Sequence, residues 1–286
     1  MNRLPIQKRA QILSMLCEGS SMRSISRVCD VSINTVTKLL VDAGEACAAF
    51  HSEAVRDVKA RRVQCDEIWS FCGSKESNTK TEKRRIGHGD VWTWTAIEAD
   101  SKLIISWLVG DRDADTATIF IQDVKDRIAN RVQLTTDGHK PYLDAVETAF
   151  GGDIDYAMLI KLYGASVEGG AQERRYSPSQ VIGTRYQRIV GAPNAHYTST
   201  SYAERHNLTM RMSMRRFTRL TNAFSKKFDN HCHALALYFT SYNWIRIHKT
   251  LRVTPAMAAG LTDKLMTWED VVALVDAREA ALKSAA

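Results

Sequence analysis

The first fifty residues carry apolar positions at helical spacing, interrupted by polar turn residues. Apolar side chains share one face of segment 7–17, Gly19 ends that segment, and Ser21 begins a second, shorter one. A tight turn at 29–31 follows, and Ser32 is a good N-cap for a third apolar-faced segment. The pattern therefore predicts three short helices in this part of the chain.

The order of these helices predicts an all-α helix-turn-helix domain over residues 1–45, followed by a linker helix over 46–61. The third helix would expose polar side chains able to meet a DNA groove. These side chains are Asn34, Thr35, Thr37 and Lys38. A small helical bundle with no role in DNA binding has the same pattern, so both interpretations stay open at this point.

From residue 62 the spacing changes from helical to strand-like. The predicted elements are strands at 63–71, 91–99 and 103–109, a helix at 116–128 capped by Asp115, a strand at 132–136, a helix ending near Phe150, and a strand at 158–162. The order β-β-β-α-β-α-β predicts the α/β class, with a ribonuclease H-like mixed sheet flanked by helices, over residues 62–260.

The rest of the chain is predicted as one long loop and three helices. Residues 164–200 show little periodicity, so we expect an insertion loop within the α/β domain. Helices are expected over 201–219 and 225–245. A C-terminal helix or tail occupies 261–286, with its helix starting near Thr267.

Composition narrows the class of protein. Hydrophobic residues make up 44% and charged residues 25%, no apolar run is long enough to cross a bilayer, and no signal-peptide core follows the first residues. The six cysteines form no C-x-x-C pair, which argues against a zinc finger and for reduced thiols. We therefore expect a folded cytoplasmic protein with no membrane partner.

Three carboxylates are predicted to meet at one edge of the sheet. Asp66 lies within the first strand, where an unpaired acid is costly, and Asp137 ends the fourth strand, where α/β sheets place ligands. Glu204 lies near the start of the helix after the loop. Carboxylates so placed can hold two Mg²⁺ ions for phosphoryl transfer.

Each of these acids also has an ordinary structural explanation. Asp137 precedes a glycine and is typical of a turn that ends a strand, and Glu204 suits a helix N-terminus without any ligand. A shift of one residue in the register of the first strand would turn Glu67, instead of Asp66, toward the site. The sequence leaves this choice open.

The strings around the acids resemble a known family. Residues 65–70 (CDEIWS), 136–139 (TDGH) and 204–209 (ERHNLT), with the tail 242–256, resemble the DDE transposases of bacterial insertion sequences. They look most like the Insertion Sequence One family, over roughly residues 5–275. Members of that family often begin with a Cys-rich zinc finger, which this chain lacks.

The resemblance implies a DDE-type DNA transposase that cleaves at the ends of its insertion sequence and joins the 3′-OH ends to target DNA. It implies Asp66, Asp137 and Glu204 as the catalytic and metal-binding triad, and two Mg²⁺ (or Mn²⁺) ions as cofactors. It also implies double-stranded DNA partners (terminal inverted repeats and target DNA), a homodimer or higher oligomer, and a nucleoid-associated place in a bacterial cytoplasm. The alternatives are a DNA-binding regulator derived from a transposase and a ribonuclease H-like nuclease without strand transfer.

Positive charge is concentrated beyond Glu204. The chain has a net charge of +7, while residues 204–252 alone contain ten cationic and two acidic side chains. Helical spacing places several of them on one face, which predicts a track for DNA phosphates. A second basic cluster, Lys80 with residues 83–85, falls between the first two strands. The predicted DNA contacts from both clusters are Lys83, Arg84, Arg85, Arg205, Asn207, Arg211 and Arg215. Solvated surface is the alternative for both.

Three histidines lie beside these motifs: His139, His206 and His248. Such side chains serve either as auxiliary groups that contact a phosphate or position water, or as structural groups in the core. The sequence does not decide between these roles.

Overall fold

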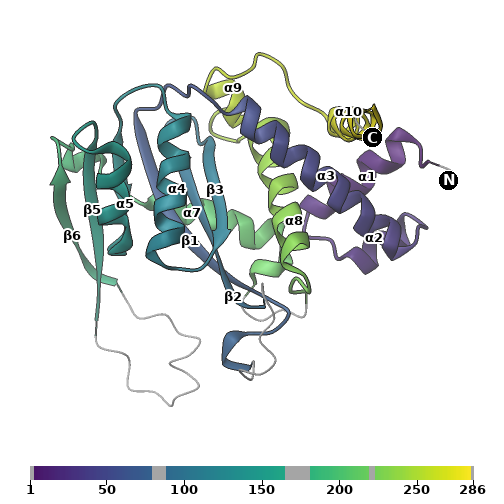
Figure 1. Cartoon of the computed structure of the whole chain (residues 1–286), viewed down its shortest axis with the longest axis horizontal. Coiled ribbons are helices and arrows are strands. Elements are labelled where there is room, and N and C mark those ends of the chain that lie inside the picture. The colour runs from purple at the N-terminus through teal and green to yellow at the C-terminus, as the bar shows by residue number, and fades with distance from the viewer. Residues whose placement is uncertain (1–2, 79–87, 165–180, 219–222, 285–286) are drawn as a thin grey trace.

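A six-stranded mixed sheet in the order β3-β2-β1-β4-β5-β6 forms the centre of the molecule (Figure 1). The computed structural model describes residues 3–78, 88–164, 181–218 and 223–284. The strands are β1 (Arg62–Cys72), β2 (Gly89–Glu98), β3 (Ile104–Gly110), β4 (Gln133–Thr136), β5 (Asp155–Tyr163) and β6 (Val181–Val190). The first three strands pair antiparallel, whereas β4 pairs parallel with β1 and β5. The α/β class, the order of the first five strands and the central β1–β4 pair are confirmed.

Helices cover both faces of this sheet and enclose two separate cores (Figure 1). The helices are α1 (Ile6–Cys17), α2 (Met22–Val28), α3 (Ile33–Ala54), α4 (Ala114–Arg127), α5 (Pro141–Phe150), α7 (Ser201–Ser213), α8 (Phe228–Thr240), α9 (Pro255–Ala258) and α10 (Trp268–Ser284). Cys65 of β1 packs in the core under α4 and α5, and Ile68 packs in the core under α7 and α8. Because side chains alternate along a strand, Asp66 shares the α7 face and Glu67 the α5 face.

The N-terminal helices form as their capping residues predict. The side chain of Ser21 accepts a hydrogen bond from the Ser24 N–H, and Ser32 accepts one from Thr35. A small core that includes Ile25 joins α1, α2 and α3. The third helix continues unbroken to Ala54, so the expected linker helix and the third helix are one element.

Two local features after residue 110 differ from the sequence prediction. The insertion loop expected over 164–200 contains β6, which pairs antiparallel with β5. Most β6 side chains are exposed, so the strand lacks the alternation that marks one buried face. The cap of α4 is Asp113, whose side chain accepts from the Thr116 N–H at 2.9 Å, instead of Asp115.

The helix expected over 201–219 is also shorter than predicted. It ends at Ser213 because Met214 adopts an extended backbone, and a 3-10 turn, Arg215–Phe217, follows. Met214 and Phe217 are both buried in the core below. The predicted helix over 225–245 is found as α8 followed by a π-helical turn, Ser241–Ile245.

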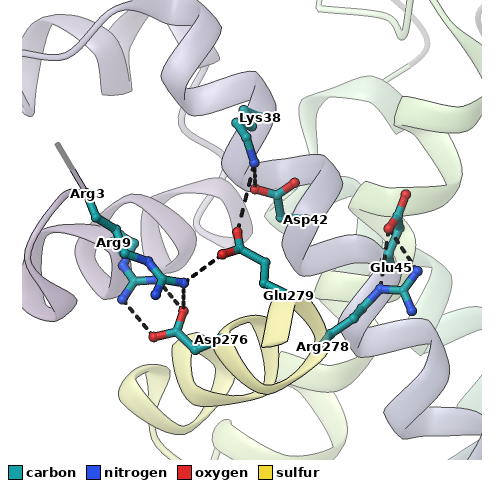
Figure 2. A network of polar contacts seen from close by, with 8 residues as sticks. All are labelled: Arg3, Arg9, Lys38, Asp42, Glu45, Asp276, Arg278 and Glu279. Atoms are coloured by element: carbon teal, nitrogen blue, oxygen red, sulfur yellow. Dashed lines mark hydrogen bonds and ion pairs between the residues drawn. The ribbon is translucent and has the colours of Figure 1, made fainter. Parts of the chain in front are cut away.

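The last helix, α10, lies against α1 and α3, so the two ends of the chain meet (Figures 1 and 2). Asp276 accepts two hydrogen bonds from the Arg9 guanidinium, at 2.6 and 3.0 Å, and also pairs with Arg3. The Arg9 side chain is only 6% exposed. Four further pairs belong to this terminal ion-pair network in Figure 2: Glu279 with Arg3, Glu279 with Lys38, Lys38 with Asp42, and Arg278 with Glu45.

Composition led to two expectations, one about the cysteines and one about membrane-spanning helices. All six cysteines carry free thiols, and five of them are buried. Within the described ranges, no helix combines the length and the apolar character needed to span a membrane.

Candidate metal centre

Asp66, Glu67 and Asp137 form a carboxylate cluster at the carboxyl end of β4. The β1–β4 register places Gln64 opposite Thr135, so two residues further on Asp137 is level with Asp66. Each of the three acids offers one oxygen, and these oxygens lie within 4.8 Å of one another. The structure thus brings together two of the three acids predicted from the sequence, with Glu67 as the third member.

Asp66 and Glu67 have different partners because they point to opposite faces of the sheet. Asp66 Oδ2 accepts a hydrogen bond from Asn207 Nδ2 of α7 at 2.8 Å. Glu67 Oε2 accepts one from Arg112 Nε at 3.1 Å, and the Glu67 side chain is only 1% exposed. Of the two candidates for the first strand, Asp66 is therefore the one on the face of the helix that carries Glu204.

The cluster contains more negative charge than its neighbours neutralise. Burial raises the pKa of Asp66 to about 7, and the charges of Glu67 and Asp137 add to this effect. Burial and Asp137 likewise raise the pKa of Glu67 to about 7, although Arg112 opposes the shift. Arg112 also approaches Asp137, with 3.6 Å between Nη2 and Oδ2. Arg112 thus pairs with two of the three carboxylates, whereas Asp66 accepts its side-chain hydrogen bond from the neutral amide of Asn207.

This arrangement fits a hard divalent cation. The donors are carboxylate oxygens, which suit Mg²⁺, and a cation would offset the repulsion that raises both pKa values. Glu67 Oε1 is buried without a hydrogen-bond partner in the described structure. A buried acceptor of this kind is costly unless a ligand satisfies it.

Glu204 lies outside the carboxylate cluster. Its Oε2 is 2.6 Å from Lys161 Nζ of β5, and its Oε1 accepts a hydrogen bond from Thr200 Oγ1 at 2.6 Å. Its charge nevertheless contributes to the raised pKa of Asp66. The triad predicted from the sequence is therefore assembled only in part.

Two contacts from β1 fix the helix that carries Glu204. Gln64 Oε1 accepts hydrogen bonds from the N–H groups of Tyr202 and Ala203, at 2.9 and 3.2 Å. One turn further along, Asn207 donates to Asp66. Because the first N–H groups of a helix have no partner within it, Gln64 both caps α7 and holds it against the strand.

Several residues of this site were not predicted. Arg112 lies in the loop after β3, where a charged run such as Asp-Arg-Asp at 111–113 is also typical of a solvated loop. Lys161 lies in a strand whose alternation does not identify its partner. The signal that could have identified both residues was their position in the chain. Arg112 follows the end of β3, Lys161 lies near the end of β5, and Asp137 follows the end of β4.

The predicted DNA contacts on α7 are only partly exposed to a ligand. Asn207 is 4% exposed and donates to Asp66, so its amide faces the carboxylate cluster, and its assignment as a DNA contact stays a prediction. Arg205 is exposed on α7. Arg215 is also exposed, but lies on the 3-10 turn after α7 and not on the same helical face as Arg211. The basic cluster at Lys80, Lys83, Arg84 and Arg85 lies outside the described residues.

The predicted contacts on α3 lie at its first turns. Asn34 is exposed and Lys38 is 63% exposed, whereas the Thr37 hydroxyl donates to the Ile33 carbonyl of its own helix. The Thr35 hydroxyl is hydrogen-bonded to Ser32. Asn34, Thr35 and Lys38 border a hollow of about 770 Å³ between α3, α10 and the N-terminal segment, whereas Thr37 does not line it. Lys38 is paired there with Asp42 and Glu279 (Figure 2).

The three histidines differ in their surroundings. The backbone N–H of His139 donates to Asp137 Oδ1 at 2.8 Å, and its ring lies 5.7 Å from that of Trp94. His206 is 2% exposed among aromatic rings, and burial lowers its pKa to about 3. His248 bonds Thr250 in a turn. His206 therefore belongs to the core, whereas the backbone of His139 orients a carboxylate of the cluster.

No protein-family model matches this sequence, and no curated protein is significantly similar to it. Similar solved structures include the piggyBac transposase synaptic complex with hairpin DNA, at 7% identity and a TM-score of 0.39, over 96% of this chain and 71% of that chain. The Mos1 transposase paired-end complex with the left transposon end has 12% identity and a TM-score of 0.22, over 52% of this chain and 58% of that chain. Such values establish no family, so function must follow from the chain's own residues.

Proposed function

We propose that this chain is a metal-dependent DNA transposase of the DDE type, built on a ribonuclease H-like sheet. The observation that carries the proposal is the carboxylate cluster, in which oxygens from Asp66, Glu67 and Asp137 lie within 4.8 Å of one another. Glu204 is on a helix that is bonded to Asp66 through Asn207. Carboxylates on neighbouring strand ends and an adjacent helix suit phosphoryl transfer.

In this proposal Asp66, Asp137 and Glu204 hold two Mg²⁺ or Mn²⁺ ions. Bound there, the ions would stabilise charge on the entering and leaving oxygens of a DNA phosphate. The protein contributes positioning: Gln64 and Asn207 hold α7 against β1. Arg112 pairs with Glu67 on the sheet face opposite α7, so that Asp66 is the β1 carboxylate on the α7 side.

The DNA would be contacted by exposed polar and cationic groups on two parts of the molecule. Arg205 and Arg215 lie near the catalytic helix, and Asn34 and Lys38 lie on α3 of the proposed helix-turn-helix. Cleavage at two terminal inverted repeats and joining to target DNA require at least two active sites, so the proposal includes a homodimer or larger assembly.

The test uses purified protein, Mg²⁺ and labelled DNA that carries the sequences flanking the gene. We expect Asp66→Asn, Asp137→Asn and Glu204→Gln each to reduce cleavage and strand transfer about a thousandfold or more. Glu269→Gln, which removes an exposed carboxylate from α10, is the matched control and is expected to leave activity unchanged. Full activity in Asp66→Asn with loss in Glu67→Gln would overturn the assignment of the β1 ligand.

The second candidate is a DNA-binding regulator with a silent catalytic core. The Glu204–Lys161 ion pair favours it, because a carboxylate already neutralised by lysine is not a free metal ligand. A regulator would bind the same DNA without cutting it, whatever the metal. Binding without cleavage by the parent protein would therefore replace the first proposal with this one.

A further inference from the structure

Lys161 and Arg112 both form ion pairs with carboxylates near the site, but in different surroundings. The Arg112 partner, Glu67, is 1% exposed. Lys161 and Glu204 are 31% and 39% exposed. Water screens a half-exposed pair, so such a pair is weak and easily exchanged, whereas a pair that includes a buried acid is costly to break. The Glu204 pair is therefore the exchangeable one.

The position of Lys161 explains why Glu204 does not join the carboxylate cluster. The β4–β5 register ends with Thr136 opposite Met158, so Lys161 lies three residues further along β5, past the end of β4 that carries Asp137. Its ammonium lies 2.6 Å from Glu204 Oε2. The backbone of α7 is held by Gln64, and Asn207, three residues after Glu204, bonds Asp66, so Glu204 lies on the part of α7 that borders the carboxylate cluster.

We infer that Lys161 is a positioning residue that holds Glu204 away from the carboxylate cluster until a divalent cation replaces the ammonium as its partner. This inference rests on the proposed function, and it assigns the released ammonium to a DNA phosphate. The exchange is favourable because the carboxylate cluster holds three acids against one arginine, whereas a lysine amine is a mobile point charge on a flexible stem. Metal binding and DNA binding are thereby coupled through one side chain.

The test measures Mn²⁺ affinity of the full chain without DNA, by calorimetry and by electron paramagnetic resonance of free Mn²⁺. Lys161→Met is expected to bind Mn²⁺ about fivefold more tightly than the parent, because no ammonium competes for Glu204. Lys161→Arg keeps the charge and should resemble the parent. In a Glu204→Gln background, Lys161→Met should change the affinity less than twofold, because the competition requires that carboxylate.

A second readout separates this role from a structural one. Lys161→Met should bind duplex DNA more weakly in the presence of metal, with its salt slope reduced by about one phosphate contact. A structural lysine would weaken both metal and DNA binding when removed. Unchanged Mn²⁺ affinity in Lys161→Met, or an equal gain in the Glu204→Gln background, overturns the inference. If that result is accompanied by loss of Mn²⁺ binding in Asp66→Asn, the inference about Lys161 fails but the proposed function stands. If neither the parent nor any variant binds Mn²⁺, both the inference and the proposed function fail.

Discussion

Carboxylates occur in two opposite electrostatic settings in this molecule. At the sheet edge, Asp66, Glu67 and Asp137 lie together, Arg112 pairs with the last two of them, and the pKa of Asp66 rises to about 7 because of burial and like charge. In the terminal ion-pair network, Asp276 is bonded to Arg9, and this bond lowers its pKa.

The difference distinguishes carboxylates that could bind a ligand from carboxylates that stabilise the fold. A network whose charges balance within the chain stabilises the fold and needs nothing from outside. A cluster whose charges repel is retained at a cost to stability, and such costs are concentrated at sites that bind or react. The contrast can be tested by changing the charge at each place.

Added metal should give the largest difference between the two settings. Mg²⁺ at one hundred times its dissociation constant should stabilise the fold by about 2.7 kcal/mol, which raises the melting temperature by roughly 5–10 °C. Asp137→Asn should remove this rise, and Asp276→Asn should keep it. The measurement is a thermal melt with and without Mg²⁺. An equal rise in both variants would remove the distinction.

Asp276→Asn should be the most harmful change within the terminal network. It leaves the buried Arg9 guanidinium without its carboxylate, at a cost of about 2 kcal/mol. Because the folded pKa of Asp276 is below its usual 3.8, its stabilisation is present above that pH and is lost as pH falls through the folded value. Urea unfolding should therefore show a larger difference from the parent at neutral pH than at acid pH. A gap that widens on acidification would contradict this sign.

Glu67→Gln should have a smaller effect, with the opposite sign. The amide oxygen can still accept from Arg112, while the repulsion with Asp137 disappears. We expect the metal-free fold to gain about 1 kcal/mol at a pH above 7, where the parent carboxylate is ionised. Denaturant midpoints at pH 8 measure the gain. Destabilisation would mean that the Arg112 ion pair outweighs the repulsion.

Arg3→Ala should have the smallest effect. The Arg3 side chain is 51% exposed, and exposed ion pairs contribute about 0.5 kcal/mol or less. Its denaturant midpoint should therefore nearly match that of the parent protein. A loss comparable to that of Asp276→Asn would show that the outer pairs also hold α10 in place.

Sequence-based prediction of the fold succeeds at positions where one local rule or one buried face decides the structure. Ser21 and Ser32 cap the helices that their side chains indicate. The meeting of Asp66 and Asp137 follows from element order, because it requires only that β1 and β4 be neighbours. Strand β6 was missed because its side chains are exposed, which removes the pattern on which strand prediction depends.

The partners of the carboxylates could not be predicted, for a different reason. Arg112 and Lys161 reach their acids across the sheet edge, and their pairing depends on side-chain geometry that no spacing encodes. The same holds for Asn207, which helical periodicity placed on a basic DNA-facing stripe, although in the structure it points at Asp66. Residue type and element order thus predict where a site lies, and long-range contacts decide how its charges are shared.

The pairing of Arg9 with Asp276 also bears on how the protein is made. The two residues are 267 positions apart, and a ribosome that adds about 5–20 residues per second reaches Asp276 tens of seconds after Arg9. Throughout that time the guanidinium on α1 lacks the carboxylate that neutralises it. The first three helices therefore obtain their contacts with α10 only when the whole six-stranded sheet has already been synthesised. A newly made chain thus completes the packing around its N-terminal helices last, although these helices were the first to emerge.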